Sequence, residues 1–236
     1  YYLSPNVSSS YTHQWGSHFF KAMAGFQMEL QENSSDYTYK DGLLTDDIYS
    51  FASANGMLYA GDDRTHWATM GMYAKLNWNY KETYFLEFSG RYDGSSRFAP
   101  GNRWGFFPSG GLGWVVSNEK FWADKPISKV VNMLKLKGSY GLVGNDNISN
   151  NDNRFFYLSE VNMNNSGRGM NFGTNFDEGY NGISISRYAN PKIGWEISHK
   201  MNVGFELKLF NDLEIQAEYF KERRTNILQE RADIPS

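Results

Sequence analysis

Apolar side chains recur at every second position in several stretches of this 236-residue chain. In the run 201–209, Met201, Val203 and Phe205 alternate with Asn202 and Glu206. The other runs of this kind cover residues 18–30, 68–80, 84–93, 134–140 and 213–219. A period of two is typical of a β-strand with one apolar and one polar face, whereas a helix repeats every 3.6 residues. The pattern predicts an all-β protein made of long antiparallel strands.

The connections between these runs alternate in kind. Tight or modest connections cover residues 81–83, about 118–131 and 211–212, and open ones cover 31–67, 98–103 and 145–195. In an antiparallel sheet, this alternation places the two kinds at opposite ends. Outer-membrane barrels have short periplasmic turns and longer extracellular loops. We therefore expect residues 31–67 and 145–195 to form long extracellular loops.

Strand length and aromatic placement agree with a membrane barrel. A tilted strand needs about 9–11 residues to cross a bilayer, while soluble strands are usually about 5–6 residues long. The aromatic residues Trp78, Tyr80 and Tyr84 gather around one tight turn, where an interfacial girdle is expected. Alternation also fits a half-buried sheet of a soluble sandwich, so the pattern alone leaves that alternative open.

Composition narrows the alternatives further. Aromatic residues make up 17% of the chain, and a mean hydropathy of −0.60 leaves no apolar run long enough for a membrane helix. The absence of cysteine excludes disulfides and thiolate metal sites. A net charge of −3 argues against a nucleic-acid partner, which would favour a basic excess.

Residues 91–114, RYDGSSRFAPGNRWGFFPSGGLGW, are the best candidates for chemistry. They lack the G-x-S-x-G pattern of a nucleophile elbow and the Gly-Lys-Ser/Thr ending of a phosphate loop. Histidines occur singly and without metal-ligand spacing, at His13, His18, His66 and His199. The sequence predicts no catalytic residue, no metal site and no cofactor.

The alternation assigns this stretch to a polar wall. Continuing the parity of the run 84–93, and of the strand that follows it, places a set of charged residues on the polar face. This expected ladder consists of Glu87, Arg91, Asp93, Arg97 and Arg103. Trp104, Phe106 and Trp114 fall on the opposite face, toward lipid.

The pairing of these two strands can also be estimated from the connection at 98–103. It would set Glu87 and Arg91 near Gly113 and Ser109, so that long charged groups lie over bare backbone. Pro108 lacks an amide donor, and we expect it to mark a bulge or a local bend that could shift this register by a residue.

Four segments carry a family resemblance: YFLEFSGRYDGSSRFAPGNRWGFFPSGGLGWVVSNEKFW, LKLKGSYGLVGNDNI, NPKIGWEISHKMNVGFELKLF and EYFKERRTNILQER. Together they resemble the barrel of the SusC/RagA-type TonB-dependent outer-membrane transporters, most strongly over residues 71–148 and 190–235. The resemblance implies an antiparallel transmembrane barrel of about 22 strands, of which residues 1–236 would supply about eight. The plug domain of these transporters is not expected in this chain.

The resemblance also implies a location and partners. The protein would lie in the outer membrane of a Gram-negative bacterium of the Bacteroidetes type, surrounded by outer-membrane lipid. It would import oligosaccharide or peptide with a SusD-like surface lipoprotein and with the TonB complex, through parts absent here, and it would not be an enzyme. The competing interpretations are a non-transporting barrel, serving as an adhesin or passive pore, and a soluble β-rich ligand-binding domain.

Ligand or partner contacts are expected from aromatic and basic residues of the long loops. Flat amphipathic rings stack on sugars or peptide side chains and leave a polar tip for hydrogen bonding. The candidates are Tyr37, Tyr39, Phe155, Phe156, Tyr157 and Arg168. Packing within the loops, or against the lipoprotein, would explain the same residues.

Overall fold

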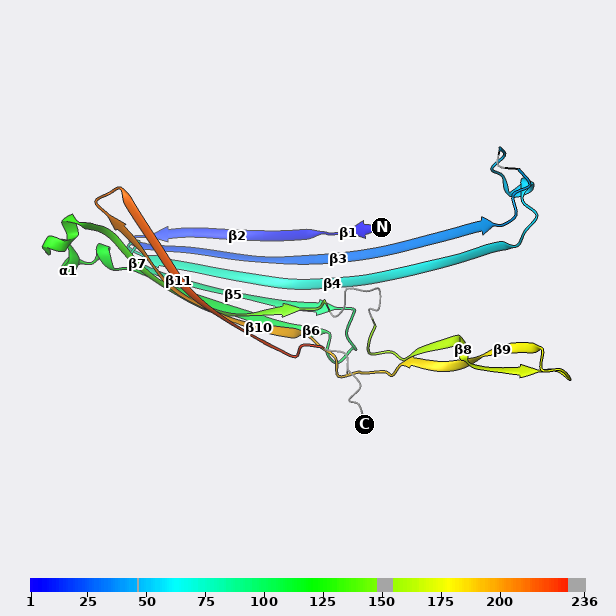
Figure 1. The fold of residues 1–236 in the computed structure, drawn as a ribbon. Helices are drawn as coiled ribbons and strands as arrows, with labels where there is room; N and C mark the ends of the chain where they lie inside the picture. The colour runs from blue at the N-terminus through cyan, green and yellow to red at the C-terminus, as the bar shows by residue number, and fades with distance from the viewer. Residues whose placement is uncertain (46, 148–154, 229–236) are drawn as a thin grey trace.

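One broad antiparallel sheet forms the body of the molecule (Figure 1). This is a computed structural model that describes residues 1–45, 47–147 and 155–228. The strands of the sheet are β1 (Tyr2–Leu3), β2 (Asn6–Trp15), β3 (His18–Lys40), β4 (Leu58–Tyr80), β5 (Tyr84–Ser95), β6 (Trp104–Val115), β7 (Val131–Asn145), β10 (Glu196–Leu209) and β11 (Leu213–Thr225). Both β1 and β2 pair with β3 in one continuous register, so the described sheet is eight strands wide. The all-β antiparallel prediction is confirmed.

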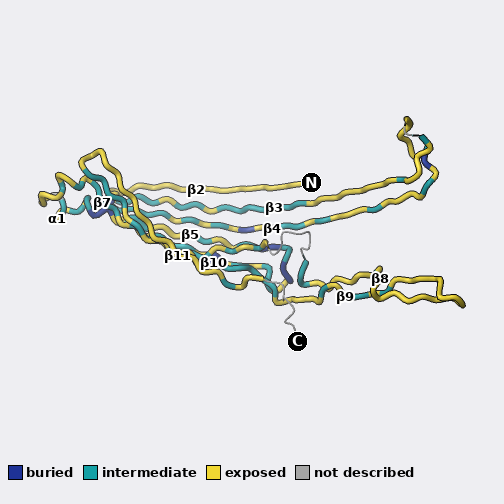
Figure 2. The backbone as a smooth tube through the Cα atoms, in the orientation of Figure 1, coloured by how far each residue is buried: buried dark blue, intermediate teal, exposed yellow. Residues whose placement is uncertain are grey.

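Pairing across neighbouring strands collects the alternating residues on two faces. Trp78 lies opposite Leu86, which lies opposite Leu112 on the apolar face, and Asn77 lies opposite Glu87 on the polar face. Leu112 remains 66% exposed, and Figure 2 shows that most of the sheet is exposed or only half-buried. A sandwich would cover these apolar side chains with a second sheet, and the described residues provide none.

The connections alternate between the two ends of the sheet. Residues 16–17, 81–83, 116–130 and 210–212 connect strands at one end, which we call the turn end. Residues 41–57, 96–103 and 146–195 connect them at the other, which we call the loop end. The longest turn-end connection contains η2 (Val116–Asn118), α1 (Lys120–Ala123) and η3 (Pro126–Lys129). The described residues include no helix long and apolar enough to span a membrane.

The segment 31–67, expected as a loop, is largely strand. Pairing between β3 and β4 runs without interruption from Gln31 opposite Trp67 to Lys40 opposite Leu58. The remaining connection is 41–57, which contains η1 (Phe51–Ser53). Figure 1 shows β3 and β4 continuing well beyond the ends of the other strands of the broad sheet. The alternation disappears here because the hairpin has no apolar face, so hydrophobic periodicity carries no signal of the strands.

The segment 145–195 also contains strands. Its hairpin consists of β8 (Glu160–Phe172) and β9 (Glu178–Arg187), which form a separate two-stranded sheet with several register shifts. Figure 1 shows this hairpin projecting from the loop end, apart from the tip of the β3–β4 hairpin. The apolar residues of this hairpin do not alternate along a whole strand, and the register shifts interrupt the pairing, so the sequence pattern did not reveal these strands.

The register between β5 and β6 differs from the expected one by two residues. Glu87 lies opposite Gly111, and Arg91 lies opposite Phe107. The pair shows no register shift at Pro108, so the expected bulge is wrong. Pairing between β6 and β7 begins at Ser109, the residue that follows the proline, so Pro108 has lost its neighbour on that side. A residue without an amide donor is tolerated where a strand has lost a neighbour.

Candidate functional site

A groove of about 450 Å³ crosses the polar face over β5, β6, β7 and β10. We call it the polar groove. Its charged and amide side chains come from the two outer strands and are Glu87, Arg91, Asp93, Lys200 and Asn202. Its floor is made of small residues, including Ser89, Ser109, Gly111, Ser139 and Gly141. The small floor leaves the space above the middle strands open.

The charges on the β5 side of the polar groove are paired. Lys75 Nζ lies 2.9 Å from Glu87 Oε1. Arg91 donates from Nε and Nη2 to the two carboxylate oxygens of Asp93, at 3.0 Å each, and its guanidinium lies over the Tyr73 ring. The groove therefore presents donors and acceptors side by side, without a large field of one sign.

The polar face continues toward the turn end as a second charged cluster. Glu206 lies between two lysines, 3.0 Å from Lys137 Nζ and 3.6 Å from Lys135 Nζ. Lys137 also pairs with Glu218 of β11. Opposite charges on adjacent strands stabilise a water-facing wall, although each exposed pair contributes little.

A partly buried ionic cluster lies at the loop-end rim. Asp146 accepts a hydrogen bond from Ser95 Oγ at 2.7 Å and pairs with Arg97 Nη1 at 3.0 Å. The Arg97 guanidinium lies 4.7 Å from the centre of the Trp67 ring. We call these four residues the rim cluster. It joins the β5–β6 connection to the beginning of the segment 146–195 and to β4.

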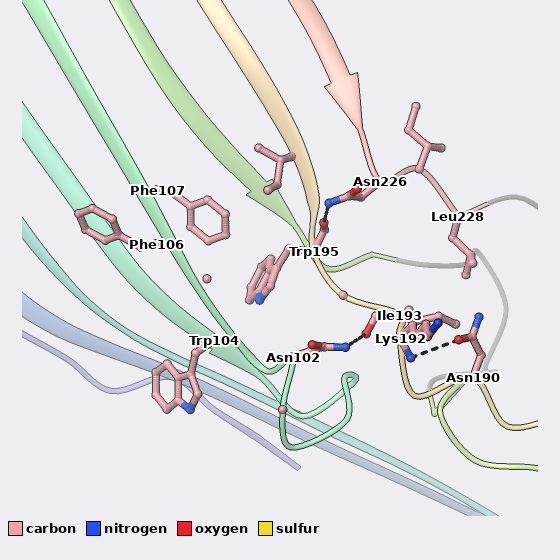
Figure 3. A pocket seen from close by; sticks show the side chains of 15 residues that line it. Asn102, Trp104, Phe106, Phe107, Asn190, Lys192, Ile193, Trp195, Asn226 and Leu228 are labelled. Atoms are coloured by element: carbon pink, nitrogen blue, oxygen red, sulfur yellow. Dashed lines mark hydrogen bonds between the residues drawn. The ribbon is translucent and has the colours of Figure 1, made fainter.

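An aromatic group next to the rim cluster holds the end of the segment 146–195 against the β5–β6 connection. The Trp195 indole N–H donates to the carbonyl of Arg103 at 2.9 Å, and its ring packs against Phe98 and Phe107. The side chain of Phe98 is completely buried. Figure 3 shows Trp195 beside Phe107, above Asn102. The β5–β6 connection is therefore held by both ends of the long segment that follows β7.

The structure divides the expected ladder into two parts. Glu87, Arg91 and Asp93 line the polar groove. Arg97 and Arg103 lie outside β5 and β6, and both serve the connection between them, since Arg103 Nε donates to the Phe98 carbonyl at 3.1 Å. Sequence reasoning missed Lys200, Asp146 and Trp195. Extending the alternation of residues 201–209 by one residue would have placed Lys200 on the polar face. Asp146 and Trp195 could not be found in this way, because their roles depend on contacts between segments that are far apart in the sequence.

The loop residues proposed for ligand contact form separate groups. Tyr37 stacks with Tyr39, which stacks with Tyr59 at 4.6 Å between ring centres. Phe155 contacts His66 and Tyr157. Phe156 packs against the guanidinium of Arg187, and Arg168 is exposed on the β8–β9 hairpin. The six residues do not share one site.

The arrangement suits non-covalent recognition. In the part of the chain with described positions, no three histidine, aspartate or glutamate side chains gather as metal ligands would. Ser95 bonds to Asp146 without an intervening histidine, so it lacks the base that activates a nucleophilic serine. Hydrogen bonding and stacking are the interactions that these surfaces offer to a solute.

Comparison with known proteins identifies the family. Residues 1–236 match the family described as TonB dependent receptor-like, beta-barrel. The chain belongs to this family. TonB-dependent receptor P3 of Formosa agariphila is 25% identical over 96% of the chain, and TonB-dependent receptor SusC of Bacteroides thetaiotaomicron is 30% identical over 89%. The chain spans about a fifth of the length of these relatives. TonB-dependent receptors are transport proteins and not enzymes.

Solved structures show the same fold. The chain is similar to the RagAB peptide transporter with a TM-score of 0.77, 22% identity and coverage of 99% of this chain and 24% of the other. The RagAB peptide importer in its closed-closed state gives a TM-score of 0.78 over 96% of this chain and 24% of the other. The TonB-dependent receptor chain is thus about eight strands of a larger antiparallel transmembrane barrel. In membrane barrels of this kind, an apolar face contacts lipid and a polar face lines the interior.

Proposed function

We propose that this chain forms part of the wall of a SusC/RagA-type, TonB-dependent importer of oligosaccharide or peptide in the outer membrane of a Gram-negative bacterium. The polar groove is the observation that carries the proposal. It combines paired acidic and basic side chains with a floor of serine and glycine on the face directed away from lipid. Similarity to SusC and to the RagAB peptide transporter supports this function.

The proposed partners act at opposite ends of the barrel. A SusD-like surface lipoprotein would cap the loop end and deliver the solute, and the TonB complex would supply energy through parts of the protein outside this chain. The pairing named in RagAB supports a partner of this kind. The exposed rings of Tyr37 and Tyr39, the group around Phe155, Phe156 and Tyr157, and Arg168 are proposed contacts for the solute or the lipoprotein.

The polar groove would favour solutes rich in hydrogen-bonding groups. A hydroxyl of a sugar or an amide of a peptide both donates and accepts, as do the Arg91–Asp93 pair and the Ser89–Ser109 pair, whose hydroxyl oxygens lie 2.6 Å apart. Exchange of one hydrogen-bond partner for another along the wall keeps the solute bound weakly enough to move. The charged cluster around Glu206 continues the same type of surface toward the turn end.

A pair of adjacent glycines provides the test. A side chain at Gly111 would project over the groove floor, since an added Cβ would have only ordinary contacts, the nearest 3.7 Å away. A side chain at Gly110 would lie beside Phe88 on the apolar face. Uptake of labelled oligosaccharides and peptides should be measured in cells that carry the full-length Gly111→Trp or Gly110→Trp transporter.

The expected result is strong loss of uptake in Gly111→Trp and near-normal uptake in Gly110→Trp at equal surface levels. Normal uptake in Gly111→Trp would contradict the groove as the path. Uptake that persists after the TonB complex is inactivated would favour the passive pore. The class of solute whose uptake depends on Gly111 identifies the cargo.

A further inference from the structure

Charged residues on the lipid-facing side are confined to one place. The spanning strands considered are β2, residues 18–30 of β3, residues 68–80 of β4, β5, β6, residues 134–144 of β7, β10 and β11. Among their described residues, the apolar face carries no aspartate, glutamate, lysine or arginine except Lys221 and Arg223. Lys221 and Arg223 are therefore two positive charges on a face that is otherwise uncharged over these residues.

The register places both side chains on the lipid-facing side. Lys221 lies opposite Met201, and Arg223 lies opposite His199. The next residue of the same face toward the turn end is Tyr219, opposite Val203. The preceding positions are Leu213, Ile215 and Ala217, so the two cations follow an apolar run on one side of β11.

The position along β11 corresponds to the outer boundary of the membrane. The strand begins at Leu213 next to the turn end, and a tilted spanning strand needs about 9–11 residues. Counted from Leu213, Lys221 is the ninth residue and Arg223 the eleventh. His199, opposite Arg223, lies with its Nδ1 2.9 Å from the Tyr140 hydroxyl oxygen. Amphipathic rings of this kind are typical of the membrane–water interface.

Neither cation is neutralised by a described carboxylate. The neighbouring Arg224 points to the opposite face and pairs with Glu222 at 2.7 Å and with Glu196 at 3.8 Å. Lys221 and Arg223 have no such ion pair within the described residues, because the lipid-facing side of these strands offers no acid. Cations at this depth attract the anionic headgroups of lipids.

A pocket of about 540 Å³ adjoins the pair on the loop-end side. It is lined by Ile197, which lies opposite Thr225, and by Asn226. Trp104 contributes an aromatic ring, and Asn102, Asn190 and Lys192 contribute polar groups (Figure 3). Asn102 and Asn226 donate from Nδ2 to backbone carbonyls, and Asn190 accepts at Oδ1 from a backbone amide, so each side chain keeps its other polar atom for a ligand. An aromatic ring beside such polar atoms is suited to a sugar, so the surface combines phosphate recognition with sugar recognition.

We propose that Lys221 and Arg223 bind the phosphate of an outer-leaflet glycolipid, whose sugar occupies the adjoining pocket. The binding is non-covalent and holds the lipid against β10 and β11. The two cations lie on the face opposite the polar groove, although Phe107 lines both the groove and the adjoining pocket. The proposal requires only that the chain be part of a membrane barrel. The presence or absence of this site is therefore independent of whether the polar groove carries a solute.

Binding to the full-length, delipidated transporter in detergent tests the proposal by native mass spectrometry. The probes are a phosphorylated glycolipid of the lipid A type, the same glycolipid without phosphates, a zwitterionic phospholipid and inorganic phosphate. The variant is Lys221→Gln/Arg223→Gln. The matched control is Lys200→Gln/Arg224→Gln, which removes two positive charges from the opposite face at the same level.

The wild type should bind the phosphorylated glycolipid at least about tenfold more tightly than the other probes, and Lys221→Gln/Arg223→Gln should lose about tenfold in that affinity. The control should retain it, and Lys221→Arg should bind as the wild type does. Three results would overturn the proposal: unchanged binding by the double variant, equal loss in the control, or equal affinity for the dephosphorylated glycolipid. Binding of inorganic phosphate as tight as that of the glycolipid would show an ion site and equally overturn it. Heat-modifiable migration of each variant in gel electrophoresis confirms that it is folded.

Discussion

The two faces of the sheet differ in how their side chains are accommodated. On the polar face, side chains from neighbouring strands are paired, as between Lys75 and Glu87 or between Lys137 and Glu206. On the apolar face, large side chains such as Phe88 and Leu112 stay exposed, and no second layer covers them within the described ranges. This difference is the one expected of a membrane barrel, in which lipid takes the place of a protein core and the interior is a solvated surface. Substitutions should therefore have opposite consequences on the two faces.

The largest expected effect comes from a charge placed on the lipid side. Phe88 is the fifth residue of β5, near the middle of the span, and Phe88→Arg should cost about 2–4 kcal/mol because the cation loses water without gaining a partner. Ser139→Arg introduces the same residue on the polar face and should change stability by less than about 0.5 kcal/mol. Urea-dependent folding of the full-length proteins into lipid vesicles measures both. Equal costs would show that the two faces are not distinct.

The second largest effect is the loss of stability when a partly buried ion pair of the rim cluster is broken, compared with the loss when an exposed ion pair is broken. Asp146→Ala should cost about 1.5–3 kcal/mol because Ser95 and the largely buried Arg97 lose their acceptor. The matched control is Asp62→Ala, which removes an exposed Arg64–Asp62 pair and should cost less than about 1 kcal/mol. The same folding assay measures the difference. Limited proteolysis of the segment 146–195 should accelerate in Asp146→Ala only, and a stable segment there would contradict the role of the rim cluster.

The smallest effect concerns charge balance in the polar groove. Glu87→Gln leaves Lys75 unpaired at a half-exposed site, so stability should fall by less than about 1 kcal/mol. If the groove is the path, uptake of anionic relative to cationic solutes should rise by a factor of less than about five, since water screens the charge. Competition between labelled solutes of either charge measures this ratio. A fall in the ratio would contradict the position of Glu87 on the wall.

Sequence alone predicted the faces better than the pairing. Parity placed Trp104, Phe106 and Trp114 on the lipid side, and the register confirms that they share the face of Tyr92 and Tyr84. The register itself was missed by two residues, because the β5–β6 connection includes the buried Phe98 and is folded against distant residues. The periodicity within one strand carries no information on contacts between the β5–β6 connection and distant residues.

The remaining failures have a common physical origin. Residues 31–40 and 58–67 pair as strands with polar side chains on both sides, so they show no hydrophobic period. Asp146 and Trp195 stand at opposite ends of a long segment and reach the rim only after β7 and β10 pair. Alternation of apolar and polar residues identifies strands that have one apolar face. It does not identify strands and loops that water surrounds on both sides.

Cysteine labelling in cells tests the central claim, that the polar face is the wetted wall of a transport path. The full-length transporter without other cysteines carries Ser139→Cys on the polar face or Leu136→Cys on the apolar face. A charged, water-soluble thiol reagent should label the cysteine at position 139 during uptake, and the transported solute should slow this labelling. The cysteine at position 136 should stay unlabelled. Equal labelling at the two positions, or labelling at position 139 that the solute does not change, would contradict this claim.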